Sequence, residues 1–293
     1  MADGSVSADH MKKSIFKKRE VRFLQPVRIS GLVLRETPFG ESDKMMTVLT
    51  AERGRISVFA RGARRLKSDF FVATQLFCYT EFVLVQSSEK YYIRECSLKE
   101  SFYSVRNTLE GLALASYIAD VAADESTEEC EHAELLRLTL NCLWTICEKK
   151  KPLPQIKAVF ELRSAAYAGF MPDLVGCAGC GNYNFPVYYI DIPDGTFRCE
   201  ECFRKNAANM ELYAARENEA EGIYCDAHLI VPVSPDVFIA MRYAVYSKPE
   251  RIFAFELSPD ALDDFAAVCE KYLLCHMERG FKTLDFYHSV AEK

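Results

Sequence analysis

Between residues 28 and 96 the chain alternates hydrophobic and polar positions over short runs, and turn residues separate these runs. A period of two is typical of β-strands with one buried face and one face in water. Five strands are predicted, over residues 28–35, 44–50, 55–60, 77–85 and 91–96. Five short strands so close together along the chain predict a small closed barrel, and the OB-fold is the common five-stranded type.

After residue 104 the hydrophobic positions recur every three or four residues, which is typical of amphipathic helices. Three helices are expected before residue 174, and Gly169 and Pro172 end the third. Two more are expected after it, each beginning with a serine cap followed by proline, at Ser234 and Ser258. The hydrophobic positions of these helices are interpreted as packing surfaces rather than binding surfaces.

Four cysteines lie between the two groups of helices, and they form the pattern C-x2-C-x18-C-x2-C. They are Cys177, Cys180, Cys199 and Cys202. Four thiolates in a tetrahedron select zinc, and a complete set leaves no position open for water or substrate. We therefore expect one structural Zn²⁺ ion. The alternative is that these cysteines are core thiols without a metal, or a disulfide pair.

The segment between the two cysteine pairs predicts a β-hairpin, with strands over residues 188–192 and 196–198. Asp194 and Gly195 are expected to supply the two positive φ angles of a two-residue hairpin turn. Hairpin and cysteines together predict a zinc ribbon over residues 174–205. Most other cysteines fall in apolar patterns, which is typical of buried free thiols.

The fold class is therefore predicted as α+β, with an N-terminal five-stranded OB-fold β-barrel followed by a mainly helical domain. Residues 26–103 are assigned to the barrel and residues 104–293 to the helical domain, which the inserted four-cysteine zinc ribbon at 174–205 interrupts. Residues 1–25 are polar and basic and are interpreted as an N-terminal arm. Residues 206–221 are acidic and rich in alanine, and are expected to be a loosely held helix or a linker.

With 293 residues, 49% of them hydrophobic, the chain is large enough for more than one core. No apolar run approaches the roughly 20 residues that a membrane-spanning helix needs. The basic N-terminus lacks the apolar segment of a secretory signal, and the many cysteines fit a reducing compartment. These features predict a cytoplasmic protein that has no membrane partner.

The net charge of −6 hides an uneven distribution along the chain. Half of the 36 Lys and Arg residues lie within the first 100 positions, but only 12 of the 42 Asp and Glu residues do. A basic first third on an acidic body favours a polyanion as the partner of the N-terminal part. A merely soluble, dipolar surface is the alternative.

A basic segment, residues 61–71, follows the third predicted strand and carries four cations with two aromatic residues close behind. The cations are Arg61, Arg64, Arg65 and Lys67, and the rings belong to Phe70 and Phe71. Cations for phosphates and flat rings for unstacked bases are what single-stranded nucleic acid requires. Four further residues on adjacent strands and turns are predicted to extend this DNA-binding track: Arg35, Lys44, Arg53 and Arg55. The alternative is a solvated loop beside two core phenylalanines.

Several ordered motifs resemble the RecO family of bacterial recombination mediators, from about Ile29 to Cys202 and more weakly through the last helices. They are Gly40-Glu41-Ser42-Asp43-Lys44, Leu49-Thr50, Gly54-Arg55-Ile56-Ser57, Arg61-Gly62-Ala63-Arg64-Arg65, Ala115-Ser116-Tyr117, Phe160-Glu161-Leu162-Arg163 and Gly169-Phe170-Met171-Pro172-Asp173-Leu174. The set as a whole is specific, although no single motif is. The basic leader of residues 1–25 departs from the family pattern.

The resemblance implies a non-enzymatic protein of DNA repair and recombination that acts in the RecFOR pathway and associates with the nucleoid during repair. RecO proteins have an N-terminal OB-fold, a helical domain and, in many members, a four-cysteine zinc module. The resemblance further implies binding to single- and double-stranded DNA and annealing of complementary strands. The implied protein partners are RecR, the acidic C-terminal tail of single-stranded-DNA-binding protein and, functionally, RecA.

Two other functions compete with this interpretation. His132-Ala133-Glu134 followed by a C-x2-C pair is similar to the zinc nucleobase deaminases, in which one His and two Cys hold the metal. Against it, Gly176 stands where proline is expected, and a second cysteine pair is available to complete the metal site. The other rival is a zinc-ribbon adaptor that works through protein contacts alone, and it would keep the same fold.

Overall fold

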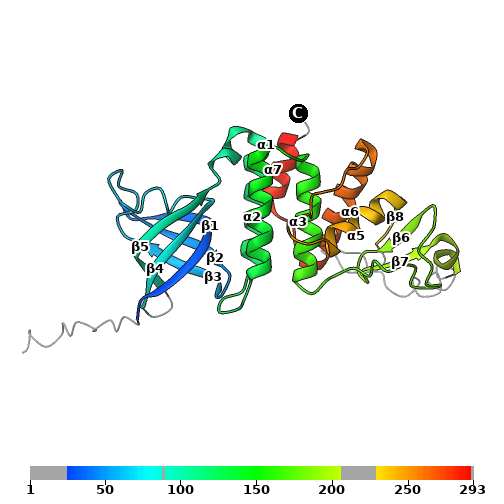
Figure 1. Cartoon of the computed structure of the whole chain (residues 1–293), viewed down its shortest axis with the longest axis horizontal. Coiled ribbons are helices and arrows are strands. Elements are labelled where there is room, and N and C mark those ends of the chain that lie inside the picture. Colours follow the sequence, from blue (N-terminus) through cyan, green and yellow to red (C-terminus); the bar gives the residue numbers. More distant parts are fainter. Residues whose placement is uncertain (1–24, 88–89, 206–228, 292–293) are drawn as a thin grey trace, which may run out of the picture.

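The computed structural model of the protein describes residues 25–87, 90–205 and 229–291. The molecule is elongated, with a β-barrel at one end, helices in the middle and a small sheet at the other end (Figure 1). The predicted arm lies outside the described residues except for its last position, and the predicted segment 206–221 lies wholly outside them.

The barrel consists of five strands that close in the order β1-β2-β3-β5-β4. Their bounds are β1 Val27–Phe39, β2 Asp43–Thr50, β3 Gly54–Ala60, β4 Cys78–Ser87 and β5 Lys90–Ser101. Neighbouring strands pair antiparallel except β3 and β5, which are parallel. The predicted five-stranded, OB-like barrel is confirmed.

Alternating residues of these strands fill the barrel interior. Val33, Met46, Val48, Val58 and Phe82 are fully or almost fully buried there. β5 runs five residues beyond its predicted end because its second half pairs with β4 through the backbone, although its side chains are mostly exposed. Main-chain pairing of this kind leaves no hydrophobic pattern in the sequence.

Besides a helical turn over residues 200–205, six longer α-helices and one 3-10 helix lie among the described residues after the barrel. They are η1 Tyr103–Asn107, α1 Leu109–Glu125, α2 Ala133–Glu148, α3 Leu153–Tyr167, α5 Pro235–Tyr246, α6 Pro259–Met277 and α7 Lys282–Ala291. Ser234 and Ser258 cap α5 and α6 as predicted, because each hydroxyl accepts a hydrogen bond from the backbone N–H three residues later. The sequence prediction of two helices after the ribbon was wrong, because α7 is a third.

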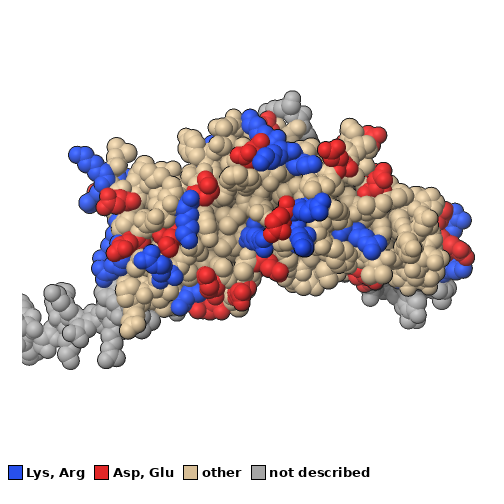
Figure 2. Space-filling model, viewed as in Figure 1, with Lys and Arg blue, Asp and Glu red and all other residues tan. Residues whose placement is uncertain are grey.

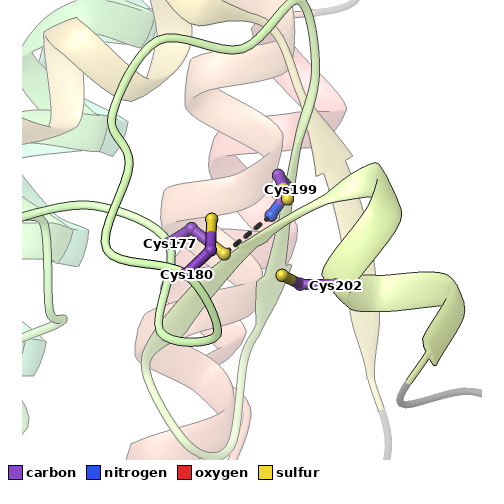
Figure 3. Close-up of side chains that lie close together, drawn as sticks. All are labelled: Cys177, Cys180, Cys199 and Cys202. Atoms are coloured by element: carbon purple, nitrogen blue, oxygen red, sulfur yellow. Dashed lines mark hydrogen bonds between the residues drawn. The ribbon is translucent and has the colours of Figure 1, made fainter.

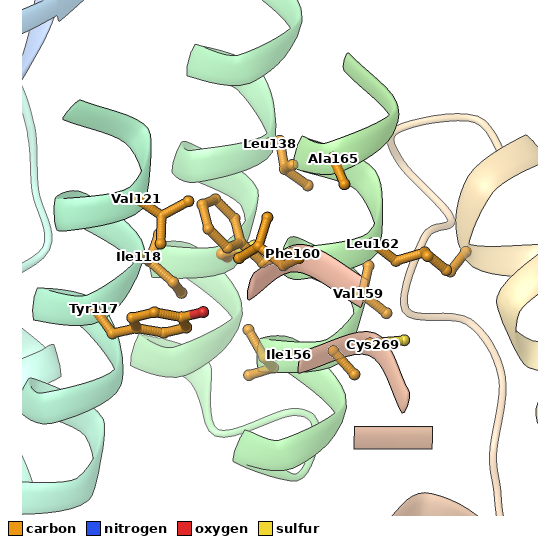
Figure 4. Packing of buried hydrophobic residues seen from close by; sticks show 14 of the residues in the cluster. Tyr117, Ile118, Val121, Leu138, Ile156, Val159, Phe160, Leu162, Ala165 and Cys269 are labelled. Atoms are coloured by element: carbon orange, nitrogen blue, oxygen red, sulfur yellow. The ribbon is translucent and has the colours of Figure 1, made fainter. Parts of the chain in front are cut away.

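Helix α3 lies at the centre of the helical part, and every residue from Gln155 to Ala165 is buried. Phe160 packs between side chains from α1 and α2, among them Ile118, Val121 and Leu138 (Figure 4). A helix that is buried on all sides belongs to a core rather than to a surface.

The charged side chains of α3 are paired inside this core. The Lys157 ammonium lies 3.0 Å from Glu161 Oε1 and 2.6 Å from Glu270 Oε2, and the Tyr117 hydroxyl donates to Glu161 Oε1 over 2.9 Å. Burial raises the pKa of the Glu161 carboxyl to about 7, although Lys157 acts in the opposite direction. Arg163 donates to the backbone oxygens of Ala244 and Ser247, which ties α3 to α5.

A three-stranded antiparallel sheet in the order β7-β6-β8 forms the far end of the molecule. β6 Tyr188–Asp191 and β7 Thr196–Cys199 match the predicted hairpin, whereas β8 Ile230–Val233 was not predicted. The prediction of a two-residue turn was wrong: four residues connect the strands, and among them only Gly195 has a positive φ, of 64°. The Tyr188 ring stacks on Phe238 of α5 at 4.2 Å between centroids, which holds the sheet against the helices.

The turn between β2 and β3 docks the barrel onto the loop between α1 and α2. The Arg55 N–H donates to the Thr127 oxygen, and the His132 N–H donates to the Ala51 oxygen over 2.8 Å. Gly54, with φ at 58°, faces this loop so closely that a Cβ atom there would overlap the Thr127 oxygen. Within the described segments we find no helix with the length and apolar character that crossing a bilayer requires.

Candidate metal centre and nucleic-acid interface

The four cysteines of the C-x2-C-x18-C-x2-C pattern come together at the free end of the ribbon. Cys177 and Cys180 lie on one loop, Cys199 ends β7, and Cys202 lies on the helical turn over residues 200–205 (Figure 3). Their four sulfur atoms all lie within 4.8 Å of one another. The hairpin between the two cysteine pairs therefore brings them together in space, although they lie apart in the sequence.

Backbone N–H groups point at the sulfur of Cys177, from Gly179 at 3.4 Å and from Cys199 at 3.3 Å. Burial alone would raise the pKa of this thiol, but the N–H groups of Cys199, Gly179 and Cys180 lower it to about 6. The pKa of the Cys202 thiol moves the other way, to about 12, through its hydrogen bond with Cys199, desolvation and the other nearby sulfurs.

These four thiols form a donor set that fits a soft divalent cation. Four thiolates so close together need a shared positive charge, and a tetrahedral ion of the zinc type supplies it. A Cβ atom on Gly179 would come within 2.8 Å of the Cys202 sulfur, so the loop needs glycine at this position. The four cysteines can bind a metal ion.

At the other end of the molecule, the basic segment is held against the turn between β1 and β2. The Gly62 N–H donates to Asp43 Oδ1 over 2.7 Å, and the Arg64 N–H donates to the Ser42 oxygen over 2.9 Å. Ala63 is fully buried beneath the segment. The short polar motif around Ser42 and Asp43 therefore fixes the backbone from which the cations project.

Arg61, Arg64, Arg65 and Lys67 are all exposed. The Arg64 guanidinium donates to the backbone oxygen of Gly40 over 3.0 Å, so its charge is oriented but not neutralised. Among the described residues, no carboxylate forms an ion pair with any of these four side chains. The barrel end of the molecule accordingly carries several Lys and Arg side chains on its outer surface (Figure 2).

The four additional residues of the predicted track are engaged elsewhere. Lys44 is buried, with its ammonium 2.7 Å from Glu36 Oε2 and 3.0 Å from the Thr74 oxygen. Arg35 pairs with Asp120 of α1 at 2.7 Å, and Arg55 donates to the Ala123 oxygen over 2.5 Å. Arg53 donates to the Tyr91 hydroxyl over 2.7 Å and lies 3.8 Å from Glu129.

Of the predicted track, the segment 61–67 presents exposed cations with no carboxylate partner among the described residues. Arg35 is exposed but paired with Asp120, and Lys44 is buried beside Glu36. Arg35, Arg53 and Arg55 contribute to packing of the barrel and to its contact with the helices. Phe70 also differs from the prediction, because its ring packs against the barrel core and is only partly exposed.

Sequence reasoning missed a row of aromatic rings on the outer face of the barrel. Phe39 lies edge-on to Phe59 at 5.3 Å between centroids, and Phe59 lies edge-on to Tyr92 at 5.6 Å. The signal was present in the strand pattern: Phe59 lies between the buried positions Val58 and Ala60, so it points away from the barrel interior.

The position of His132 contradicts the deaminase-like arrangement. Its Nε2 atom accepts a hydrogen bond from the Thr127 N–H over 3.1 Å, at the contact between barrel and helices. The group of possible metal ligands found in the described residues consists of the four cysteines and includes no histidine. His132 has a structural role.

Comparison with known proteins gives two matches to family models. Residues 24–102 match the family model described as Recombination protein O N terminal, and residues 106–216 match the model described as Recombination protein O C terminal. The chain is 32% identical to the DNA repair protein RecO of Acetivibrio thermocellus over 90% of its own length and 97% of that protein. Similar coverage is found with the RecO proteins of Alkaliphilus metalliredigens, at 24% identity over 90% and 99%, and Symbiobacterium thermophilum, at 28% identity over 89% and 96%.

Proposed function

Because the chain belongs to the RecO family of DNA repair proteins, we propose that it is a non-enzymatic mediator of DNA repair and homologous recombination. In this role it binds single- and double-stranded DNA and anneals complementary strands. Together with RecR it helps to load RecA onto DNA coated by single-stranded-DNA-binding protein. The proposed location is the cytoplasm, at the nucleoid during repair.

The observation that carries this proposal is the group of four exposed cations at 61–67, on an OB-like barrel, for which the described residues supply no carboxylate partner. The faces and loops of such barrels are where oligonucleotides bind. Arg64 and Arg65 contact phosphates, and Arg61 and Lys67 extend the contact on either side. Cations that have no carboxylate partner need not break an ion pair before they bind a phosphate, so little of the electrostatic attraction is lost.

At the metal centre, the proposed ion is one structural Zn²⁺, and its ligands are Cys177, Cys180, Cys199 and Cys202. The ion supplies positive charge and a fixed tetrahedral geometry to a ribbon whose strands are only four residues long. It keeps the far end of the helical domain in shape and takes no part in binding DNA.

In the same proposal, the helical domain binds the acidic C-terminal tail of single-stranded-DNA-binding protein, while RecR joins the complex on DNA. The tail contact brings the barrel to strands that are already coated. Annealing then needs two strands to be held with their bases accessible, and a protein that attracts phosphates reduces the repulsion between the strands.

Strand annealing tests the proposal. Two complementary oligonucleotides, one with a donor dye and one with an acceptor dye, are each coated with single-stranded-DNA-binding protein and mixed. The chain should accelerate the rise in energy transfer, and coating protein that lacks its acidic tail should weaken the effect. If the chain retains the tail peptide on beads but neither binds DNA nor anneals it, a zinc-ribbon adaptor is the correct description.

A further inference from the structure

The outer face of the barrel carries an aromatic row that the core does not explain. We define it as Phe39, Phe59 and Tyr92, which come from β1, β3 and β5. Each ring lies edge-on to the next, at 5.3 Å and 5.6 Å between centroids. Phe39 is 56% exposed, and the other two rings are partly exposed.

Strand register places Phe59 and Tyr92 side by side, and Phe39 at the end of β1 contacts Phe59 through its ring. Phe59 pairs with Tyr92 across β3 and β5, and with Met45 across β2 and β3. Neighbours in register point to the same side of a sheet, so all of them lie outside the barrel. Apolar rings on this outer face contribute little to the stability of the barrel, because side chains from the inner face of the strands already fill its interior.

Cations border the aromatic row on one side. The Arg61 guanidinium carbon lies 5.3 Å from the centroid of the Tyr92 ring, and Arg64 and Arg65 follow it in the chain. A planar guanidinium beside flat rings gives a continuous surface on which bases can stack, while the neighbouring charges attract the phosphates that connect them.

We propose that Phe39, Phe59, Tyr92 and Arg61 form a stacking platform for unpaired bases, which gives the barrel its preference for single-stranded over double-stranded DNA. This inference rests on the proposed function, since it names the DNA form for the same surface. In a duplex the bases are already stacked on each other, so the rings gain nothing from it. In a single strand the faces of the bases are accessible, and stacking on the rings adds to the attraction between cations and phosphates.

Fluorescence anisotropy with three labelled probes tests the platform: an oligothymidylate, an abasic strand of the same length, and a duplex. Phe39→Ala should weaken binding to the oligothymidylate about ten-fold, which is the order expected for one lost base–aromatic stack. Binding to the abasic strand and the duplex should not change. The fold should tolerate this substitution because Phe39 is 56% exposed.

Two further variants serve as controls. Phe39→Tyr keeps an aromatic ring at this position and should bind all three probes as the wild type does. Leu66→Ala removes an exposed apolar side chain from the basic segment without removing a ring, and it should bind normally. The platform is refuted if Phe39→Ala binds oligothymidylate as well as the wild type does, or weakens on the abasic strand equally. If the wild-type chain binds none of the probes, the proposed function fails as well.

Discussion

At the scale of single residues, two glycines show how the same backbone conformation serves different purposes. Gly40 and Gly54 both have a positive φ, at 61° and 58°. A Cβ atom on Gly40 would meet open space, whereas one on Gly54 would overlap the Thr127 oxygen at the contact between barrel and helices. Gly54 is thus required by tertiary packing as well as by its dihedral angle.

Alanine substitutions separate these two costs. Gly40→Ala should lower the free energy of unfolding by only about 1 kcal/mol, the cost of holding a residue with a side chain in the left-handed region. Gly54→Ala should cost about 3 kcal/mol or more, because the clash adds to that strain. Chemical denaturation of both variants measures the difference. Equal losses of unfolding free energy in the two variants would show that the close approach at Gly54 adds nothing to the cost of the substitution.

Some residues that the sequence prediction misplaced could have been placed from strand phase alone. Lys44 is in phase with Met46 and Val48 on β2, so its burial could have been deduced from the alternation that located the strand. Arg55 is different, because it points outward and is covered by α1. Its contact with Ala123 depends on how the barrel docks onto the helices, and no local pattern encodes that.

At the scale of elements, the ribbon depends on something other than its own core. Its strands are four residues long, and Tyr188, Ile190 and Phe197 join the core of the helical part. Such a small unit needs additional stabilisation, and the four cysteines provide it if they hold an ion.

Cys199→Ser tests the role of the metal in the ribbon. The variant should lose its zinc and a few kcal/mol of unfolding free energy, since metal-binding energy becomes folding energy when the site forms only in the folded chain. Native mass spectrometry measures the ion, and thermal unfolding measures the stability. Cys130→Ser is the matched control, because Cys130 is exposed and lies outside the cluster. Identical metal content and melting in the two variants would rule out a structural metal at this cluster.

Elements were predictable where periodicity is strong, and were missed where pairing with distant residues creates the structure. The five barrel strands and the first three helices follow from their hydrophobic patterns. β8 is four residues long, contains Pro232 and exists because it pairs with β6. Helix α7 is short. Its buried positions Leu284, Tyr287 and Val290 are recognisable as core positions only once they pack against α1 and the other helices. The domain boundaries at 103/104 and 174–205 stay predictions.

At the scale of the whole molecule, the barrel and the ribbon lie at opposite ends of the long axis (Figure 1). The first 100 residues hold half of the Lys and Arg side chains, while most Asp and Glu lie in the remainder. Under the proposed function, this distribution along the chain favours the approach of a DNA strand to the N-terminal part rather than to the acidic remainder. In the proposed function, DNA binds at one end of this long axis and the structural ion lies at the other end.

The most direct test of DNA binding by the basic segment is anisotropy with a labelled single strand across a salt series. The double variant Arg64→Ala/Arg65→Ala should bind more weakly, and its log–log salt slope should become shallower by about 1.4, or about 0.7 for each lost phosphate contact. Arg204→Ala/Lys205→Ala removes two exposed charges at the ribbon end and should bind as the wild type does. Equal weakening by the two double variants, or unchanged binding by the first, would contradict the account.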